Sequence, residues 1–265
     1  MSSRPRRFVF RPFSFLYLGI LFLLFLFMGS IFTTYFRSLL VEALGVPPEA
    51  YGVVLLLSLV GSYINIPLTT VEARVPIYTY REVKFWMVTW RMPQVEMGVR
   101  RTYITVNLGG AVVPLLISAY LVLWSIPAHS PDLALSYIQL LVVLAVVTIT
   151  THRSARIVKG LGIATPMFGP PVTTALTTLL VDLVSPMSCP AQVAYVGGTL
   201  GALIGADLLN LGKLPELGAP VASIGGAGTF DGIYLTGLIS VSLILLLYYD
   251  NSIIGCPCIP CPCRG

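Results

Sequence analysis

The chain has 265 residues, of which 56% are hydrophobic and only 10% are charged, so most of its surface cannot face water. This composition excludes an ordinary soluble domain and predicts an all-α, polytopic integral membrane bundle. The net charge of +5 indicates orientation in a membrane and contact with anionic lipid, and it gives no reason to expect a nucleic-acid partner.

Seven hydrophobic stretches have about the length of 20 residues that a helix needs to cross a bilayer. The first follows a basic start, residues 1–13, but its apolar core is too long for a cleavable signal peptide. We therefore expect one helical domain over residues 14–249 with seven transmembrane helices, at 14–36, 51–68, 103–125, 133–151, 161–187, 191–211 and 227–249.

Basic residues predict the orientation of these helices. Arg4, Arg6, Arg7 and Arg11 place the amino terminus in the cytoplasm by the positive-inside rule. Six further basic residues between 69 and 102 fall on the same side. We therefore predict a multi-pass protein of the cell membrane with a cytoplasmic N-terminus and an extracytoplasmic C-terminus.

The segment 69–102 is the longest polar part of the chain. It carries arginines among aromatic residues such as Tyr78, Trp86 and Trp90. Such a mixture is typical of a helix that lies on the inner leaflet. A plain connecting loop explains the same residues, so both readings stay open.

Two aspartates, Asp207 and Asp231, lie at matched depths near the cytoplasmic ends of the sixth and seventh helices. A charge inside a transmembrane helix is costly and normally faces the bundle interior or a wet cavity. A short connection makes these helices an antiparallel hairpin, so we expect the two carboxyl groups to meet. Mutual repulsion would then leave one as an acid and the other as a base. We take them as candidate catalytic residues.

Five further polar residues are predicted near the cytoplasmic ends of the helices, in the same layer as the aspartates. We take them as candidate binding residues: Asn65, Asn107, His152, Arg156 and Asn210. Asn210 is close enough to Asp207 along the chain to share its face. His152 and Arg156 also fit a simple basic helix end among lipid headgroups.

Simpler readings compete for the aspartates and for the glycines around them. Gly197, Gly201 and Gly205 recur at the spacing that lets membrane helices approach closely, which is packing and not chemistry. Asp231, in GGAGTFDG, could also be a capping residue that complements the dipole of its helix.

The fifth hydrophobic stretch contains Pro166, Gly169, Pro170 and Pro171, which cannot continue a regular helix. Irregular backbone at membrane depth is tolerated only beside protein or a cavity. We therefore expect a broken helix, which would indicate a pathway for a ligand or an ion.

The tail, residues 250–265, packs Cys256, Cys258, Cys261 and Cys263 into CPCIPCPC. Such density is typical of disulfides or of a metal thiolate site. The predicted external location favours disulfides, and Cys189, near the same face, is a further partner for the tail.

Five phrases in chain order, SYINIPL, VNLGGAVVP, THRSAR, YVGGTLGALIGADLLNL and IGGAGTFDGIYLTGL, resemble a family of archaeal and bacterial polytopic membrane proteins known as domain of unknown function 1614. The likeness covers roughly residues 51–248 and implies the architecture but no activity. A weaker analogy is to intramembrane aspartyl proteases of the presenilin and prepilin-peptidase type. Their Gly-x-Gly-Asp motif is matched neither by Gly205-Ala206-Asp207 nor by the residues before Asp231.

Three functions remain open. In the first, Asp207 and Asp231 form the acid and base of a hydrolase that cleaves a peptide or lipid bond. In the second, they line the path of a transporter or channel for a small solute, cation or proton. In the third, the polar layer only joins helices in a non-catalytic assembly subunit. A metal held by the aspartates with Asn107 and His152 is a variant of the first two. The sequence names no cofactor, substrate or oligomeric state, and membrane lipids are the one partner it implies.

Overall fold

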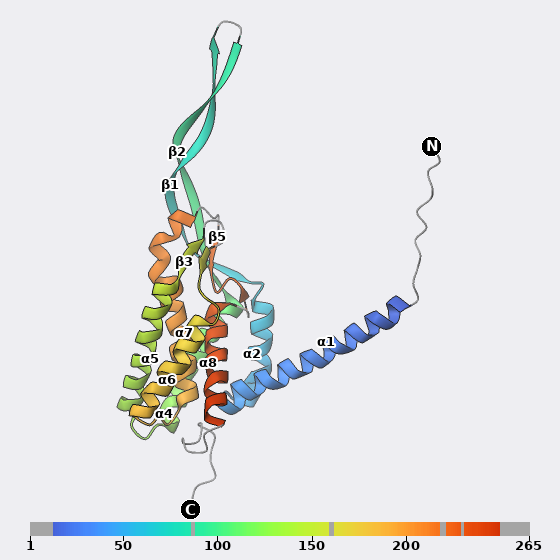
Figure 1. Cartoon of the computed structure of the whole chain (residues 1–265), viewed down its shortest axis with the longest axis vertical. Helices are drawn as coiled ribbons and strands as arrows, with labels where there is room; N and C mark the ends of the chain where they lie inside the picture. The colour runs from blue at the N-terminus through green and yellow to red at the C-terminus, as the bar shows by residue number, and fades with distance from the viewer. Residues whose placement is uncertain (1–12, 86–87, 159–161, 218–220, 229–230, 250–265) are drawn as a thin grey trace, which may run out of the picture.

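The computed structural model describes residues 13–85, 88–158, 162–217, 221–228 and 231–249. The described part is a helical bundle with a long two-stranded ribbon rising from one end (Figure 1). We call this the hairpin end and the other the opposite end. The basic N-terminus and the cysteine-rich tail, residues 250–265, lie outside the described residues.

The elements follow the hydrophobic pattern closely. The α-helices are α1 (Phe13–Arg37), α2 (Pro48–Gly61), α3 (Val113–Tyr120), α4 (Ile126–His129), α5 (Leu133–Ser154), α6 (Gly169–Val184), α7 (Pro190–Ala202) and α8 (Gly232–Tyr249). They are extended or joined by the π-helical turns η1 (Ser38–Ala43), η2 (Leu108–Val112), η3 (Leu121–Ser125) and η4 (Leu203–Asp207), and by the 3-10 segment η5 (Leu208–Leu217). The strands are β1 (Asn65–Phe85), β2 (Val88–Asn107), β3 (Arg156–Val158), β4 (Gly162–Ala164) and β5 (Val221–Ile224).

All seven hydrophobic stretches contain a helix. Within the described ranges, four helical segments are long and apolar enough to cross a membrane: Phe15–Ala43, Leu108–His129, Leu133–Ser154 and Pro190–Lys213. The other three are apolar but shorter: Pro48–Gly61, Gly169–Val184 and Gly232–Leu247. The structure thus supports a mainly helical membrane protein, and seven crossings remain a prediction.

Side chains are distributed as a membrane environment requires. Large apolar residues such as Phe25, Leu123 and Leu180 are exposed on the outer surfaces of the helices, whereas Gln192 and Thr199 are fully buried in the middle. Exposed apolar surface on this scale is typical of contact with lipid. α1, which leans away from the bundle in Figure 1, is exposed along nearly its whole length.

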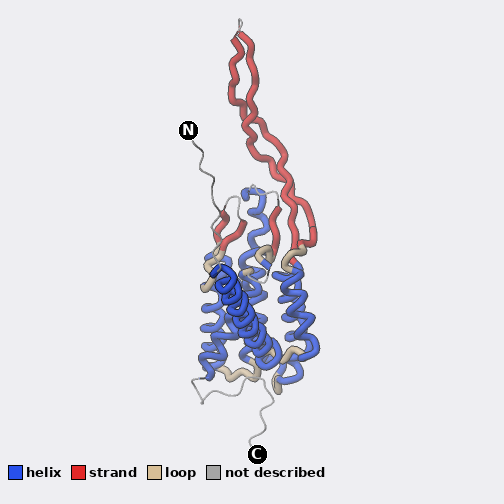
Figure 2. Tube along the Cα trace, turned by 90° about the vertical axis from the view of Figure 1, so that its right-hand side faces the viewer, coloured by secondary structure: helices blue, strands red, loops and turns tan. Residues whose placement is uncertain are grey.

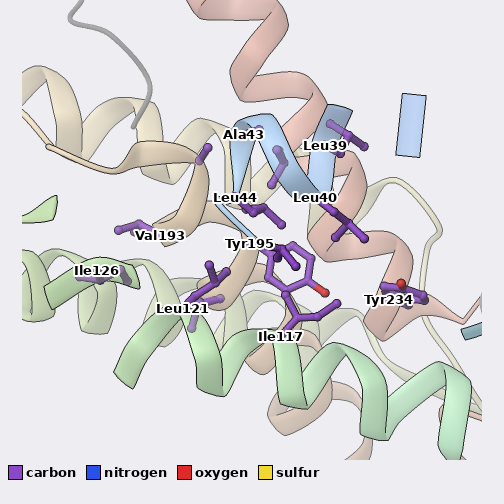
Figure 3. Packing of buried hydrophobic residues seen from close by; sticks show 14 of the residues in the cluster. Leu39, Leu40, Ala43, Leu44, Ile117, Leu121, Ile126, Val193, Tyr195 and Tyr234 are labelled. Carbon is purple, nitrogen blue, oxygen red and sulfur yellow. The ribbon is translucent and has the colours of Figure 1, made fainter. Parts of the chain in front are cut away.

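Helix α7 forms the centre of the bundle, where it packs against α3, α5, α6 and α8. Its glycines permit this packing, as the sequence predicts. A Cβ atom at Gly197 would lie 2.7 Å from Val143 of α5, and one at Gly201 would lie 2.7 Å from Val147. The bundle core also holds Tyr195 among leucine and isoleucine side chains (Figure 3).

The prediction of an interfacial helix or a plain loop at 69–102 is wrong, and the mainly helical fold carries a strand ribbon that the all-α prediction did not include. β1 and β2 pair antiparallel from Asn65↔Asn107 to Phe85↔Val88, and β5 pairs parallel with the base of β2. The two views show this ribbon twisting away from the bundle (Figures 1 and 2). The sequence signal was present: Val, Thr, Tyr and Ile alternate with charged residues at a period of two, which favours a strand over a helix.

The predicted break in the fifth helix is also wrong. α6 begins at Gly169, so Pro170 and Pro171 occupy its first turn. The first residues of a helix have no partner for their N–H groups, and proline there loses no hydrogen bond. Residues 162–168, which we expected inside the membrane helix, form β4 and a turn at the hairpin end instead.

Candidate functional site

Asp231 is the capping residue of α8. Its Oδ1 accepts a hydrogen bond from the backbone N–H of Ile233 at 3.0 Å, and its Oδ2 accepts one from Ala227 at 3.2 Å. The backbone N–H of Leu235 donates to the carbonyl oxygen of Asp231 at 2.9 Å, which begins the helix. The capping interpretation of this residue is therefore confirmed. It explains why a carboxylate directly precedes the apolar residues of α8.

The glycines before Asp231 set the position of this cap. Gly225 and Gly228 have φ values of 70° and 66°, in the left-handed region that favours glycine. The turn they form lies directly against η2, because a Cβ atom at Gly110 would lie 2.5 Å from the carbonyl oxygen of Gly228. This close contact fixes the start of α8 against η2, the helical turn that follows the hairpin.

Asp207 is the last residue of η4, the π-helical turn that continues α7. Gly205 brings this turn against the backbone of α5, since a Cβ atom there would lie 2.5 Å from the carbonyl oxygen of Thr148. The Asp207 side chain is half-buried. Among the described residues its carboxyl group has no hydrogen-bond donor, in contrast to Asp231. Single π-helical turns are often found at functional sites.

The two aspartates line the same cavity of about 70 Å³ at the hairpin end. Thr165, in the loop after β4, and Thr236, one turn into α8, also line it, and the Thr236 hydroxyl donates to the carbonyl oxygen of Gly232. Apolar atoms complete it, from Ile163, Ala202, Ala206, Gly232 and Ile233.

Asn65 and Asn107 belong to a separate group at the base of the hairpin. The Asn107 side chain donates to the carbonyl oxygen of Ser62 at 2.8 Å and to Asn65 at 3.2 Å, and it accepts from the N–H of Gly110 at 2.8 Å. Ser223 of β5 donates to Asn65 at 2.7 Å. These bonds hold the ribbon to the bundle, and neither asparagine lines the acidic cavity.

His152 and Asn210 form a third group. Nδ1 of His152 lies 3.3 Å from Nδ2 of Asn210 and 3.3 Å from the carbonyl oxygen of Gly205, so it can accept from one or donate to the other. Asn210 also donates to Ala206 at 2.9 Å and accepts from Nζ of Lys213 at 2.9 Å. Arg156 is an exposed residue of β3.

Apart from the exposed Arg156, the predicted site residues therefore form three groups, and of these residues Asp207 and Asp231 are the ones that line the cavity. Asn107 and His152 make hydrogen bonds outside this cavity and are not among the residues that line it. Across the described ranges no three His, Cys, Asp or Glu side chains come together as metal ligands.

Three polar residues of the structure were not predicted from the sequence as residues of interest. Thr165 and Thr236 line the cavity, but isolated threonines in apolar runs give no signal. Asp182 is buried at the opposite end, where it accepts a hydrogen bond from the N–H of Met187 at 2.6 Å. An acidic residue in the apolar run TTLLVDLV is the same kind of signal that singles out Asp207 and Asp231 in the sequence.

Cys189, at the start of α7, is disulfide-bonded. The four other cysteines of the sequence all lie in the tail, outside the described residues. The disulfide interpretation of the cysteines thus gains support at Cys189, and a metal site in the tail remains untested.

Comparison with known proteins gives a family and no activity. The model of a family described as a protein of unknown function (DUF1614) matches residues 59–243. No curated protein and no solved structure is similar enough to the chain to count as a match. The matched range includes the hairpin, both aspartates and every element that lines their cavity.

Proposed function

The chain belongs to the DUF1614 family of proteins of unknown function. From its geometry we propose that it carries a small cation across a membrane through Asp207 and Asp231, and that this cation is the proton. The observation that carries this proposal is the shared cavity of the two carboxyl groups. Paired carboxyl groups at membrane depth are typical of proton relays.

The size of the cavity supports a small occupant. At about 70 Å³ it has room for a few water molecules, each of which takes about 30 Å³ in the liquid. Pockets that hold an organic ligand usually exceed about 300 Å³. A peptide segment or a lipid headgroup does not fit unless the wall opens.

The composition of the wall favours a proton over a divalent cation. Calcium takes six to eight oxygen ligands and magnesium requires near-octahedral geometry. The cavity offers two carboxyl groups and the hydroxyls of Thr165 and Thr236, and both oxygens of Asp231 already accept backbone hydrogen bonds. A proton needs only one oxygen at a time.

A hydrolase is the second candidate, and one observation favours it. Asp231 accepts two N–H donors, which stabilise a carboxylate, whereas Asp207 has no donor among the described residues. This asymmetry would assign Asp231 as the base that activates water and Asp207 as the acid. The bond cleaved would be a peptide or lipid bond at the membrane boundary.

The sidedness is part of the proposal. The hairpin carries the basic residues of segment 69–102, so by the positive-inside rule the hairpin end faces the cytoplasm and the cavity lies at the cytoplasmic ends of the membrane helices. Cys189 and the opposite end would then face outward, where disulfides are stable.

Proton flux into proteoliposomes tests the proposal. The protein is reconstituted with a pH-sensitive dye inside, a potassium diffusion potential drives proton uptake, and Asp207→Asn and Asp231→Asn are compared with wild type. Asp132→Asn is the matched control, because Asp132 is an exposed cap of α5. We expect flux in the wild type and the control and none in the two cavity variants.

Three results would contradict the proposal. Equal flux in all four proteins would show that the cavity does not carry protons. Absence of flux in every protein, together with cleavage of membrane peptides or lipids that both cavity variants lose, would assign the hydrolase instead. Full activity of both variants in each assay would leave only a structural role for the aspartates.

A further inference from the structure

A line of buried polar side chains runs along α7, away from the acidic cavity and toward the opposite end. Gln192, Tyr195 and Thr199 are spaced by three and four residues, so they share one side of the helix. All three are fully buried, with no exposed surface. Ala202, one turn beyond Thr199 on the same side, is part of the cavity wall.

Each of these side chains has one buried polar atom without a hydrogen-bond partner among the described residues. Oε1 of Gln192, the hydroxyl of Tyr195 and Oγ1 of Thr199 are all buried without a hydrogen bond among the described residues. The hydroxyls of Tyr195 and Thr199 lie near each other, but they do not reach the geometry of a hydrogen bond. The Tyr195 hydroxyl is directed toward the side of Tyr234 (Figure 3).

Unpaired buried polar atoms are unusual, because each costs free energy unless water or another group satisfies it. Three on one side of one helix call for a common cause. Water molecules inside proteins typically make about three hydrogen bonds to such atoms. A line of waters beside α7 would satisfy all three groups at once.

Both ends of this line reach other polar groups. At the opposite end, Nε2 of Gln192 donates to Oγ of Ser125 at 2.9 Å and to the carbonyl oxygen of Leu44 at 3.2 Å. At the cavity end, Thr199 lies against Gly237 of α8, next to the cavity residue Thr236. From Gln192 to Ala202 the helix rises about 15 Å at 1.5 Å per residue.

We propose that ordered water molecules beside Gln192, Tyr195 and Thr199 form a hydrogen-bonded path that carries protons between the acidic cavity and the opposite end of the bundle. This inference rests on the proposed function for the claim that protons move along the path. The presence of the water molecules does not depend on the proposed function. The waters exchange protons through Tyr195 and Thr199, whose hydroxyls can both donate and accept.

The first test is proton flux in proteoliposomes of variants that remove a hydroxyl and keep the shape. Tyr195→Phe and Thr199→Val are paired with Tyr137→Phe and Thr150→Val. The controls lie on α5, where both hydroxyls donate to backbone carbonyl oxygens. We expect flux to fall about tenfold in each α7 variant, as when one hydrogen bond is lost from the rate-limiting step, and to stay unchanged in the controls.

The second test detects the water itself. Brief X-ray radiolysis of the reconstituted wild type labels aromatic side chains that touch water. We expect label on Tyr195 although it is fully buried, and none on Phe36, which is buried in the apolar core. Asp207→Asn should keep the label on Tyr195, because it leaves the path intact.

The two tests separate this inference from the proposed function. Wild-type flux that Asp207→Asn abolishes but that Tyr195→Phe and Thr199→Val leave unchanged would overturn the path alone. Labelled Tyr195 in a protein that moves no protons would keep the water line and reject the proposed function. An unlabelled Tyr195 would overturn the inference whatever the flux, since the interior would then be dry.

Discussion

The cap at Asp231 gives the sharpest prediction, because two substitutions separate its structural role from its charge. Asparagine caps a helix about as well as aspartate, whereas alanine cannot cap. Asp231→Asn and Asp231→Ala both remove the carboxylate, so both relieve its repulsion with Asp207 equally. The difference between the two variants therefore measures the cap alone.

The magnitude follows from the two bonds that Asp231 accepts. The bond from Ala227 is exposed, so water replaces it at little cost. The bond from Ile233 is partly buried, and its loss costs about 1 kcal/mol, the usual value for a cap. Asp231→Ala should therefore unfold roughly 2–4 °C below Asp231→Asn, as expected for a chain of this size.

Thermal unfolding in detergent micelles, followed by intrinsic fluorescence, measures this difference. Proton flux in proteoliposomes is measured on the same preparations. We expect both variants to lose flux, since neither an amide nor a methyl group takes up a proton, while only Asp231→Ala loses the cap. Equal melting temperatures for the two variants would refute the capping geometry, and flux through Asp231→Asn would refute the role of the charge.

Three further predictions concern the scaffold. Gly237→Ala should destabilise the protein by about 1–3 kcal/mol through overpacking, because its Cβ would collide with Thr199; Gly52→Ala, with open space around it, should not lower the melting temperature. Asn107→Ala should cost about 1–3 kcal/mol by leaving the buried N–H of Gly110 unpaired, and an unchanged melting temperature would count against the hairpin anchor. Cys189 is buried and disulfide-bonded, so in the denatured protein a maleimide should label it only after reduction; labelling without reductant would contradict the disulfide.

The positions of the helices could be predicted from the sequence because length and hydropathy decide them. Every predicted stretch contains a helix, and the errors occur where a local pattern competes with hydropathy. The hairpin was not predicted because charged residues among aromatic residues also fit an interfacial helix. Only their alternation at a period of two favours strands. Pro170 and Pro171 predict a break within a helix, but proline also favours the first turn of a helix, which is where they lie.

The candidate site was predictable only in its charged members. Asp207 and Asp231 stand out because charge is rare in apolar helices, and they do line one cavity. Asn107 and His152 were grouped with them by depth, but depth does not give the direction in which a side chain points. The hydroxyls of Tyr195 and Thr199 are invisible in a sequence, since only the packing of α7 shows that they are buried without partners.

The most direct test of the account is whether the acidic cavity takes up a proton. Infrared difference spectra of the protein in membranes, recorded between acid and neutral pH, report the C=O band of a protonated carboxyl group shielded from bulk water. We predict such a band in the wild type and in Asp132→Asn, and its loss in Asp207→Asn and Asp231→Asn. The same band in all four proteins, or no band in any, would contradict it.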